Sequence, residues 1–262
     1  MDTIQPPLFT SGYTAVNGIN MYYEIYGEGK PLVLIHGGGS TIQTSFAKVI
    51  PLFCQARKVI AVELQAHGRT GDRPAPESFE QDADDVAGLL QNIGITRADI
   101  LGFSNGGSTT MQLAIRHPQL VNKIIVASAF YKREGMYPWF WEFMPNATLA
   151  NMPAELQEAY KQVAARPEEL ETMHNKDRDR MLNFKDWSDD ALKSIAAPAL
   201  FITADKDVMT PEHTVAMHRL VANSRLAILP GGHGEYLGEI TFKNPGKLPE
   251  ITVALVNEFL EG

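Results

Sequence analysis

The chain has 262 residues, of which 44% are apolar and 21% charged, and its formal net charge is −8 at pH 7. These values are typical of one large globular domain or of a domain that carries an insertion. The acidic balance, with no run of Lys or Arg, argues against a nucleic-acid-binding surface. The single cysteine, Cys54, excludes an internal disulfide.

Targeting signals are missing from the sequence. The first seven residues lack the basic start and apolar core of a secretory signal. No stretch approaches the roughly 18 apolar residues of a membrane span, and a lone thiol suits a reducing compartment. We therefore expect a cytoplasmic protein that binds neither membranes nor nucleic acid. The sequence leaves open whether it is a monomer or a homodimer.

The first strands precede a glycine-rich loop. Residues 13–16 and 19–26 flank Asn17-Gly18, a pair typical of a hairpin, and residues 31–35 are continuously apolar, as in a strand buried on both faces. The next residues, 36–40, are His-Gly-Gly-Gly-Ser. Glycines let backbone N–H groups approach a small anion, which predicts an oxyanion loop. The Lys-Ser/Thr ending of a phosphate-binding loop is missing.

A helix at 44–55 and a buried strand at 58–62 follow, and then a polar turn that contains His67. We expect His67 to stabilise its loop by hydrogen bonding and not to act in catalysis. Ser78 has the spacing of a helix cap and opens a helix at 81–92. Three acids lie near its start, and we expect them to be solvated and not to bind metal: Asp82, Asp84 and Asp85.

The most specific motif lies in residues 99–107. A short apolar run ends in Gly-x-Ser-x-Gly around Ser104 and passes directly into a helix at 108–117. A serine on so tight a turn has a strained backbone, and the residues two before and two after it must lack a Cβ. Gly102 and Gly106 meet that need. The motif therefore predicts that Ser104 is an exposed nucleophile at a strand end.

Strands alternating with helices at this spacing predict a parallel, doubly wound sheet. Another apolar strand at 123–128 continues the pattern. In such sheets the active site lies at the carboxyl ends of the strands. The glycines at 37–39 and Ser104 both fall there.

Residues 130–196 have helical patterns and prolines in place of strand-like runs. Their large soft side chains form either the small core of a helical insertion or one wall of a substrate pocket. We expect the charged run at 175–180 to be a solvent-exposed helix face.

The last strands supply an acid and a base. The strand at 198–203 leads to Asp205 and Asp207, and the strand at 225–229 leads to His233 in a glycine-rich loop. A serine nucleophile needs a base, and the base needs a carboxylate that fixes its tautomer. The pattern therefore predicts a site made of Ser104, His233 and one of these two aspartates. His213 and His218, five residues apart, share a helix face poorly and make a weak metal site.

These motifs resemble those of the α/β-hydrolase superfamily, and the resemblance covers essentially the whole chain. It implies a mostly parallel, doubly wound, eight-stranded sheet, with a core at 1–129 and 197–262 and a helical cap at 130–196. The family's Gly-x-x-Asp-x-x-x-Pro pattern maps onto residues 204–211, which favours Asp207 over Asp205 although Ala204 replaces the glycine. Glu63 departs from the aspartate that is frequent at its site in the family.

The resemblance also implies acyl chemistry without a cofactor or a metal. Relatives that displace halide or open epoxides use an aspartate nucleophile, which Ser104 argues against. Backbone N–H groups of Gly38 and Asn105 are expected to hold the oxyanion, with Gly39 as an alternative to Gly38. The expected substrate is a small-molecule ester or related carbonyl compound. We expect its pocket to include Phe103, Trp139, Phe140, Phe143 and Met144.

Other activities stay open at this point. The glycine-rich loop resembles that of family members that hydrolyse carbon–carbon bonds in vinylogous diketones. Lactonase and perhydrolase activities are compatible with the same motifs. A small-molecule receptor that keeps these residues but turns over poorly is the alternative outside the enzyme class.

Overall fold

The computed structural model describes residues 7–262 and contains one eight-stranded sheet in the order β1-β2-β4-β3-β5-β6-β7-β8. The strands are β1 (Phe9–Val16), β2 (Ile19–Tyr26), β3 (Lys30–Ile35), β4 (Arg57–Val62), β5 (Ala98–Phe103), β6 (Val121–Ala127), β7 (Ala199–Lys206) and β8 (Ser224–Gly232). β2 pairs antiparallel with both β1 and β4, and every other neighbouring pair is parallel. The predicted fold is therefore confirmed.

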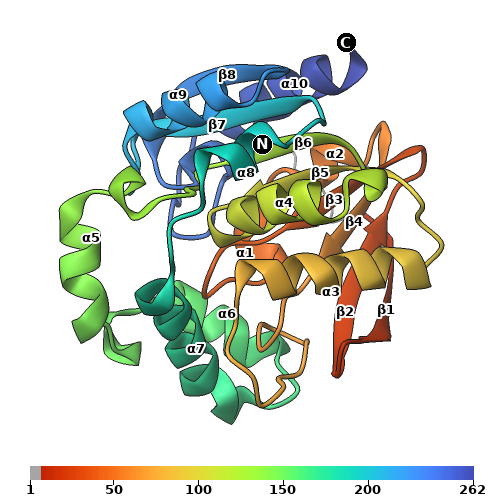
Figure 1. Ribbon diagram of the computed structural model, residues 1–262. Coiled ribbons are helices and arrows are strands. Elements are labelled where there is room, and N and C mark those ends of the chain that lie inside the picture. The colour runs from red at the N-terminus through yellow and green to blue at the C-terminus, as the bar shows by residue number, and fades with distance from the viewer. Residues whose placement is uncertain (1–6) are drawn as a thin grey trace.

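Helices cover both faces of the sheet (Figure 1). One face packs against α3 (Phe79–Asn92), α4 (Asn105–Arg116), α8 (Asp189–Lys193) and α9 (Pro211–Leu220). The other packs against α1 (Ile42–Phe46), α2 (Ile50–Phe53) and α10 (Leu248–Glu261). The two cores are separate because successive side chains of a strand point to opposite faces.

Strand β3 illustrates this division. Val33 and Ile35 belong to one core, Leu32 and Leu34 to the other, and all four side chains are buried. A strand that is apolar on both faces has no stable position at the edge of a sheet. Its central place brings the glycine loop after Ile35 beside the carboxyl end of β5, where Ser104 lies.

Three predicted helices have different bounds in the structure. The helix expected at 108–117 is α4, which begins three residues earlier, at Asn105, and ends at Arg116. Residues 44–55, expected as one helix, form the short helices α1 and α2, and Pro51 lies in the first turn of α2. Proline lacks the N–H that a continuous helix would use there, so the chain starts a new helix. α3 begins two residues earlier than expected, at Phe79, because Ser78 accepts a hydrogen bond from the backbone of Gln81 as its N-cap.

The segment between β6 and β7 is made of helices and loops. It contains α5 (Pro138–Phe143), α6 (Ala154–Val163), α7 (Leu170–Asn183) and α8, with short 3-10 turns between them. Figure 1 shows α5, α6 and α7, coloured green to teal, grouped on one side of the sheet. A backbone bond from Tyr137 to the carbonyl of Val208 ties the start of this segment to the loop after β7.

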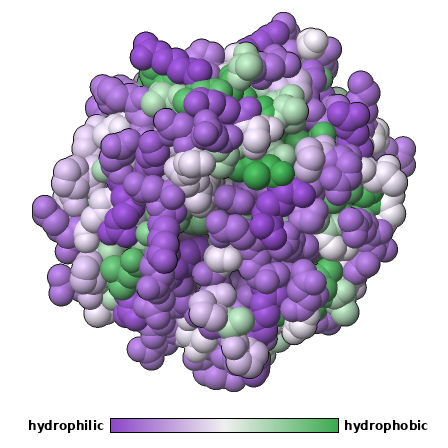
Figure 2. All heavy atoms as spheres, in the orientation of Figure 1, coloured by the Kyte–Doolittle hydropathy of each residue, from purple (hydrophilic) through white to green (hydrophobic). Residues whose placement is uncertain are grey.

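The surface drawn in Figure 2 is polar, as expected for a globular domain of this composition. The face drawn in Figure 2 is mostly hydrophilic, with apolar residues in small separate patches. Among the helices of residues 7–262, none has the length and apolar character needed to cross a bilayer.

Candidate active site

Ser104 lies on a strained turn between β5 and α4. Its backbone has φ 56° and ψ −121°, a conformation that residues other than glycine rarely adopt. The Ser104 N–H donates to the carbonyl of Ala127 at the end of β6 (2.8 Å), which holds the turn against the sheet. The hydroxyl is thereby raised above the carboxyl end of the sheet.

The glycines beside Ser104 are sterically required. A Cβ on Gly102 would lie 2.0 Å from the carbonyl oxygen of Gly106, and a Cβ on Gly106 would lie 2.1 Å from that of Ile35. Real Cβ atoms do not approach backbone oxygens so closely. The backbones of β3, β5 and α4 therefore meet only because glycine occupies both positions.

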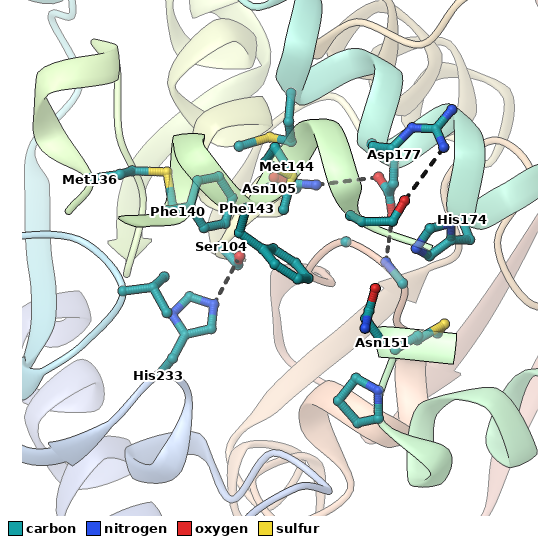
Figure 3. A pocket seen from close by; sticks show the side chains of 18 of the residues that line it. Ser104, Asn105, Met136, Phe140, Phe143, Met144, Asn151, His174, Asp177 and His233 are labelled. Atoms are coloured by element: carbon teal, nitrogen blue, oxygen red, sulfur yellow. Dashed lines mark hydrogen bonds between the residues drawn. The ribbon is translucent and has the colours of Figure 1, made fainter. Parts of the chain in front are cut away.

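The structure brings together the side chains of Ser104, His233 and Asp207. Nε2 of His233 lies 3.0 Å from Oγ of Ser104, and Nδ1 of His233 lies 2.6 Å from Oδ1 of Asp207. The Ser104 contact is drawn in Figure 3. Asp205, the alternative acid, is exposed and accepts a hydrogen bond from the backbone of Gly231 (2.8 Å). Only Asp207 is in position to orient His233.

The carboxylate of Asp207 is held by donors on both oxygens. Oδ1 accepts from the N–H of Val208 (2.7 Å) and Oδ2 from the N–H of Ala204 (3.2 Å). Burial alone would raise the pKa of Asp207, but the charge and hydrogen bond of His233, together with hydrogen bonds from Ser128 and the backbone of Ala204, hold that pKa below its usual value. The side chain is therefore ionised and fixed in orientation.

Two residues that support Asp207 were not predicted from the sequence. Ser128 donates its hydroxyl to Oδ2 of Asp207, and the buried Tyr236 hydroxyl lies 2.7 Å from Oγ of Ser128. Because Ser128 uses its proton on the carboxylate, Tyr236 is the donor of the second bond. Ser128 directly follows β6, and this strand-end position was the signal that could have identified it.

The glycine loop after β3 is tied down by His36. Nδ1 of His36 lies 2.7 Å from the carbonyl of Gly37, and Nε2 accepts from the N–H of Leu64 (3.0 Å). One ring nitrogen thus donates and the other accepts, as in a neutral imidazole. Burial lowers the pKa of His36 to about 3, in agreement with that form. Gly39, with φ 65°, adopts a backbone conformation that favours glycine.

The expectation of solvent exposure is wrong for part of the acids on α3 and part of the charged run on α7, although Asp84 and Asp179 are exposed at least in part. Asp82 and Asp85 on α3 are buried, and Arg180 on α7 is buried with them. Arg180 Nη1 donates to Oδ2 of Asp82 (2.6 Å), and Arg73 Nη2 donates to Oδ2 of Asp85. Arg180 and Asp82 are 98 residues apart in the sequence and Arg73 and Asp85 are 12 apart. In both pairs the carboxylate is buried and its charge is compensated by the arginine.

Asp177, also predicted to be solvated, reaches the glycine loop instead. Its Oδ2 accepts from the N–H of Gly39 (2.5 Å) and lies 2.9 Å from Nε2 of His67. Its Oδ1 accepts from the guanidinium of Arg180 and from Nδ2 of Asn105 (3.3 Å). Figure 3 shows the Asp177 and Asn105 side chains facing each other.

His67 carries a positive charge in this network. Nδ1 lies 2.7 Å from the carbonyl of Gln65, and Nε2 faces the Asp177 carboxylate, so both ring nitrogens must be protonated. Burial by itself lowers the pKa of His67, but the charge of Asp177 and its hydrogen bond outweigh burial and raise that pKa to about 9. His67 thus stabilises its loop, as predicted, and also binds α7.

A cavity of about 290 Å³ opens above Ser104 and His233. Gly38, Gly39 and Asn105 form its floor. Its apolar wall comes mainly from residues of the segment 130–196 and from the loop after β7: Phe130, Met136, Phe140, Phe143, Met144, Met181, Val208 and Met209. Asn151, His174, Asp177 and Arg178 form a polar side (Figure 3). Within residues 7–262, no group of three or more His, Cys, Asp or Glu side chains is arranged to hold a metal ion.

Three of the five predicted pocket residues line the cavity: Phe140, Phe143 and Met144. Phe103 and Trp139 do not, which corrects the expectation for these two. Phe103 is buried behind His233, with 4.8 Å between the ring centroids. Trp139 is half exposed on the outer side of α5. The aromatic composition of 139–144 left both a small core and a pocket wall open, and the structure shows both uses: Phe140 and Met144 pack against a core cluster and also line the cavity.

Comparison with known proteins gives a consistent result. A sequence model of the alpha/beta hydrolase family matches residues 32–239. The chain is 29% identical over 239 residues to the serine hydrolase BPHL of Homo sapiens, covering 85% of this chain and 79% of that protein. It is 27% identical over 261 residues to a pimeloyl-(acyl-carrier protein) methyl ester esterase of Neisseria meningitidis, covering 89% and 94%.

A solved structure shows the same fold. The crystal structure of a serine hydrolase involved in carbazole degradation matches with a TM-score of 0.78 and 19% identity, over 97% of this chain and 99% of that one. At this identity the likeness concerns the fold alone.

Proposed function

Because this chain belongs to the alpha/beta hydrolase family, we propose that it is a serine hydrolase that cleaves an ester or related carbonyl compound through an acyl-enzyme intermediate. The observation that carries the proposal is the continuous hydrogen-bonded series Ser104, His233 and Asp207 at the floor of an apolar cavity. The names of the serine hydrolase and the methyl ester esterase among its relatives support the same reaction class.

The geometry supports a two-step mechanism. As Oγ of Ser104 attacks the carbonyl carbon, Nε2 of His233 takes its proton, and the ionised Asp207 stabilises the imidazolium that forms. His233 then gives that proton to the departing alcohol, which leaves the acyl group on Ser104. In the second step His233 takes a proton from a water molecule as the water oxygen attacks the acyl carbonyl. His233 then returns that proton to Oγ of Ser104 as the bond between the acyl carbon and Oγ breaks and the acid leaves.

We assign the oxyanion to the backbone N–H groups of Gly38 and Asn105. Asn105 is the first residue of α4, so its N–H lies at the positive end of a helix and beside Ser104. Gly38 lines the same cavity, and a Cβ on it would lie 2.4 Å from Nδ2 of Asn105, so the two residues are adjacent. Gly39 is the weaker candidate of the glycine loop because its N–H already donates to Asp177.

In this proposal residues 1–129 and 197–262 are the catalytic core and residues 130–196 are a cap. The cavity lies between the two, since its floor comes from the core and much of its wall from α5 and α7. The cap supplies most of the apolar surface and would select the substrate by shape.

A panel of p-nitrophenyl esters with acyl chains of increasing length tests the proposal. We expect turnover that falls by about 10³-fold or more in Ser104→Ala and a phosphonate adduct on Ser104 in the unmodified protein. Tight ligand binding with negligible turnover would instead indicate a receptor. Full activity in Ser104→Ala would refute the mechanism.

A further inference from the structure

The carboxylate of Asp177 fills what is otherwise a complete anion-binding site. Four donors converge on it: the N–H of Gly39, the imidazolium of His67, the side-chain amide of Asn105 and the guanidinium of Arg180. We name this set of four donors the anion cradle. Two of the donors are cations and all four are aimed at one carboxylate, which is the arrangement by which proteins bind carboxylate groups.

The anion cradle borders the cavity, and two of its four donors, Gly39 and Asn105, line it. Asp177, Gly39 and Asn105 line the same cavity as Ser104, and Asn105 directly follows Ser104 in the chain. A Cβ built on Gly38 would lie 3.1 Å from Oδ2 of Asp177, which places this oxygen against the proposed oxyanion loop. A substrate that extends from Ser104 toward α7 therefore comes close to this carboxylate.

The Asp177 carboxylate is held in place by Arg180, which is itself fixed by a second carboxylate. Arg180, which donates to Asp177, also donates to Asp82 on α3 (2.6 Å), and both side chains are buried. The cation is thus fixed by a second carboxylate from the core. Asp177 cannot swing away to admit a substrate anion without leaving Arg180 and His67 partly unpaired in a buried setting.

We propose that Asp177 is a specificity-determining residue that occupies the anion cradle beside Ser104 and restricts the enzyme to substrates without a carboxylate on the α7 side. The inference rests on the proposed hydrolase function. A substrate carboxylate in this arm would find the donors already used and would face a fixed negative charge. Like charges held close together in a partly buried site are strongly disfavoured. An uncharged acyl chain has no charge for the Asp177 carboxylate to repel and can pack on the apolar wall of the cavity.

Two p-nitrophenyl esters of equal chain length test the selectivity. We expect the native enzyme to favour the neutral pentanoate over the anionic glutarate monoester by about 100-fold in kcat/KM. In Asp177→Asn, which keeps the side-chain shape, this ratio should fall at least tenfold. The matched control is Glu171→Gln, which neutralises an exposed carboxylate in the first turn of α7 outside the cavity and for which the ratio should stay unchanged. An unchanged ratio in Asp177→Asn would overturn the proposal.

A binding measurement separates this inference from the proposed reaction. Asp177→Ala empties the anion cradle, so sodium acetate should raise its thermal midpoint by several degrees relative to sodium chloride at equal ionic strength. The native protein and Glu171→Ala, which removes an exposed carboxylate of α7 outside the cavity, should show no such difference. If Asp177→Ala folds only in acetate, the recovery of folded protein provides the same evidence. Equal midpoints in both salts would refute the anion cradle whether or not the protein hydrolyses esters.

Discussion

Ser128 donates its hydroxyl to Oδ2 of Asp207, the oxygen on the other side of the carboxylate from the one that faces His233. Tyr236 donates in turn to Ser128 (2.7 Å), so a buried series of hydroxyl groups supports the proposed catalytic acid from behind. Such an arrangement fixes which oxygen of Asp207 is presented to His233. The orientation of the acid therefore depends on two residues that never contact a substrate in the cavity.

The role of Asp207 can be separated from that of Asp205 by matched substitutions. Asp207→Asn keeps the side-chain shape but removes the charge that stabilises protonated His233, so kcat should fall on the order of 10⁴-fold. Asp205→Asn changes an exposed side chain that bonds only the backbone of Gly231, and its kcat should stay within about twofold of the native value. Steady-state kinetics on one p-nitrophenyl ester checks both. The reverse pattern would move the acid to Asp205.

The hydrogen bonds of Ser128 and Tyr236 behind Asp207 should contribute measurably to the free energy of unfolding. Ser128→Ala leaves the buried hydroxyl of Tyr236 without its acceptor and should lower the free energy of unfolding by about 1–3 kcal/mol. In the double variant Ser128→Ala/Tyr236→Phe that unpaired hydroxyl is gone, so its loss should be smaller than the sum of the two single losses. Urea unfolding of the four proteins measures the difference. Strict additivity would show that the two hydroxyl groups do not interact.

The steric role of Gly106 predicts a severe effect from one added carbon. In Gly106→Ala, and more so in Gly106→Val, the Cβ would meet the backbone oxygens of Ile35 and His36 at 2.1 and 2.5 Å. We expect these variants to be insoluble or to lose more than about 4 kcal/mol. Gly71→Ala is the control, because a Cβ there meets nothing within 4 Å. A stable, active Gly106→Ala would contradict the packing of β3 against α4.

The ion pairs between α7 and the core should dominate the stability of that contact. Arg180→Met removes a buried cation and leaves Asp82 and Asp177 without it, which should cost about 3–5 kcal/mol. Arg178→Met, on the same helix, removes an arginine that is partly exposed and pairs with Asp179, and should cost less than about 1 kcal/mol. Thermal or urea unfolding compares them. Similar costs would mean that the buried pair is replaceable by packing.

The charge on His67 predicts a pH dependence. Its pKa in the folded protein, about 9, is above its ordinary value of 6.5, so its contribution to stability is complete below pH 6.5 and is lost as the pH rises through 9. By linkage this contribution is on the order of 3 kcal/mol. The free energy of unfolding should fall more steeply between those pH values in the native protein than in His67→Gln. Parallel pH curves would show that His67 is uncharged.

Local sequence rules account for the proposed catalytic residues. Gly102 and Gly106 are needed where three backbones meet, and this steric demand marks Ser104 without knowledge of the tertiary fold. The alternation of apolar strands with helices predicted a parallel sheet, and in such a sheet the strand ends converge. That convergence places the loops of Asp207 and His233 beside Ser104, and the structure agrees in geometry.

Only the tertiary structure decided which charged residues face solvent and which are buried in ion pairs. The sequence predicts a solvent-exposed helix face at 175–180. A charged helix face has the same sequence pattern whether it contacts water or another charged segment. Asp177 finds Gly39 and His67 more than 100 residues away, and Arg180 finds Asp82 98 residues away. Pairing at such separations depends on how α7 packs against the sheet. Periodicity along the chain carries no information about that packing, and the proposed selectivity of the cavity depends on it.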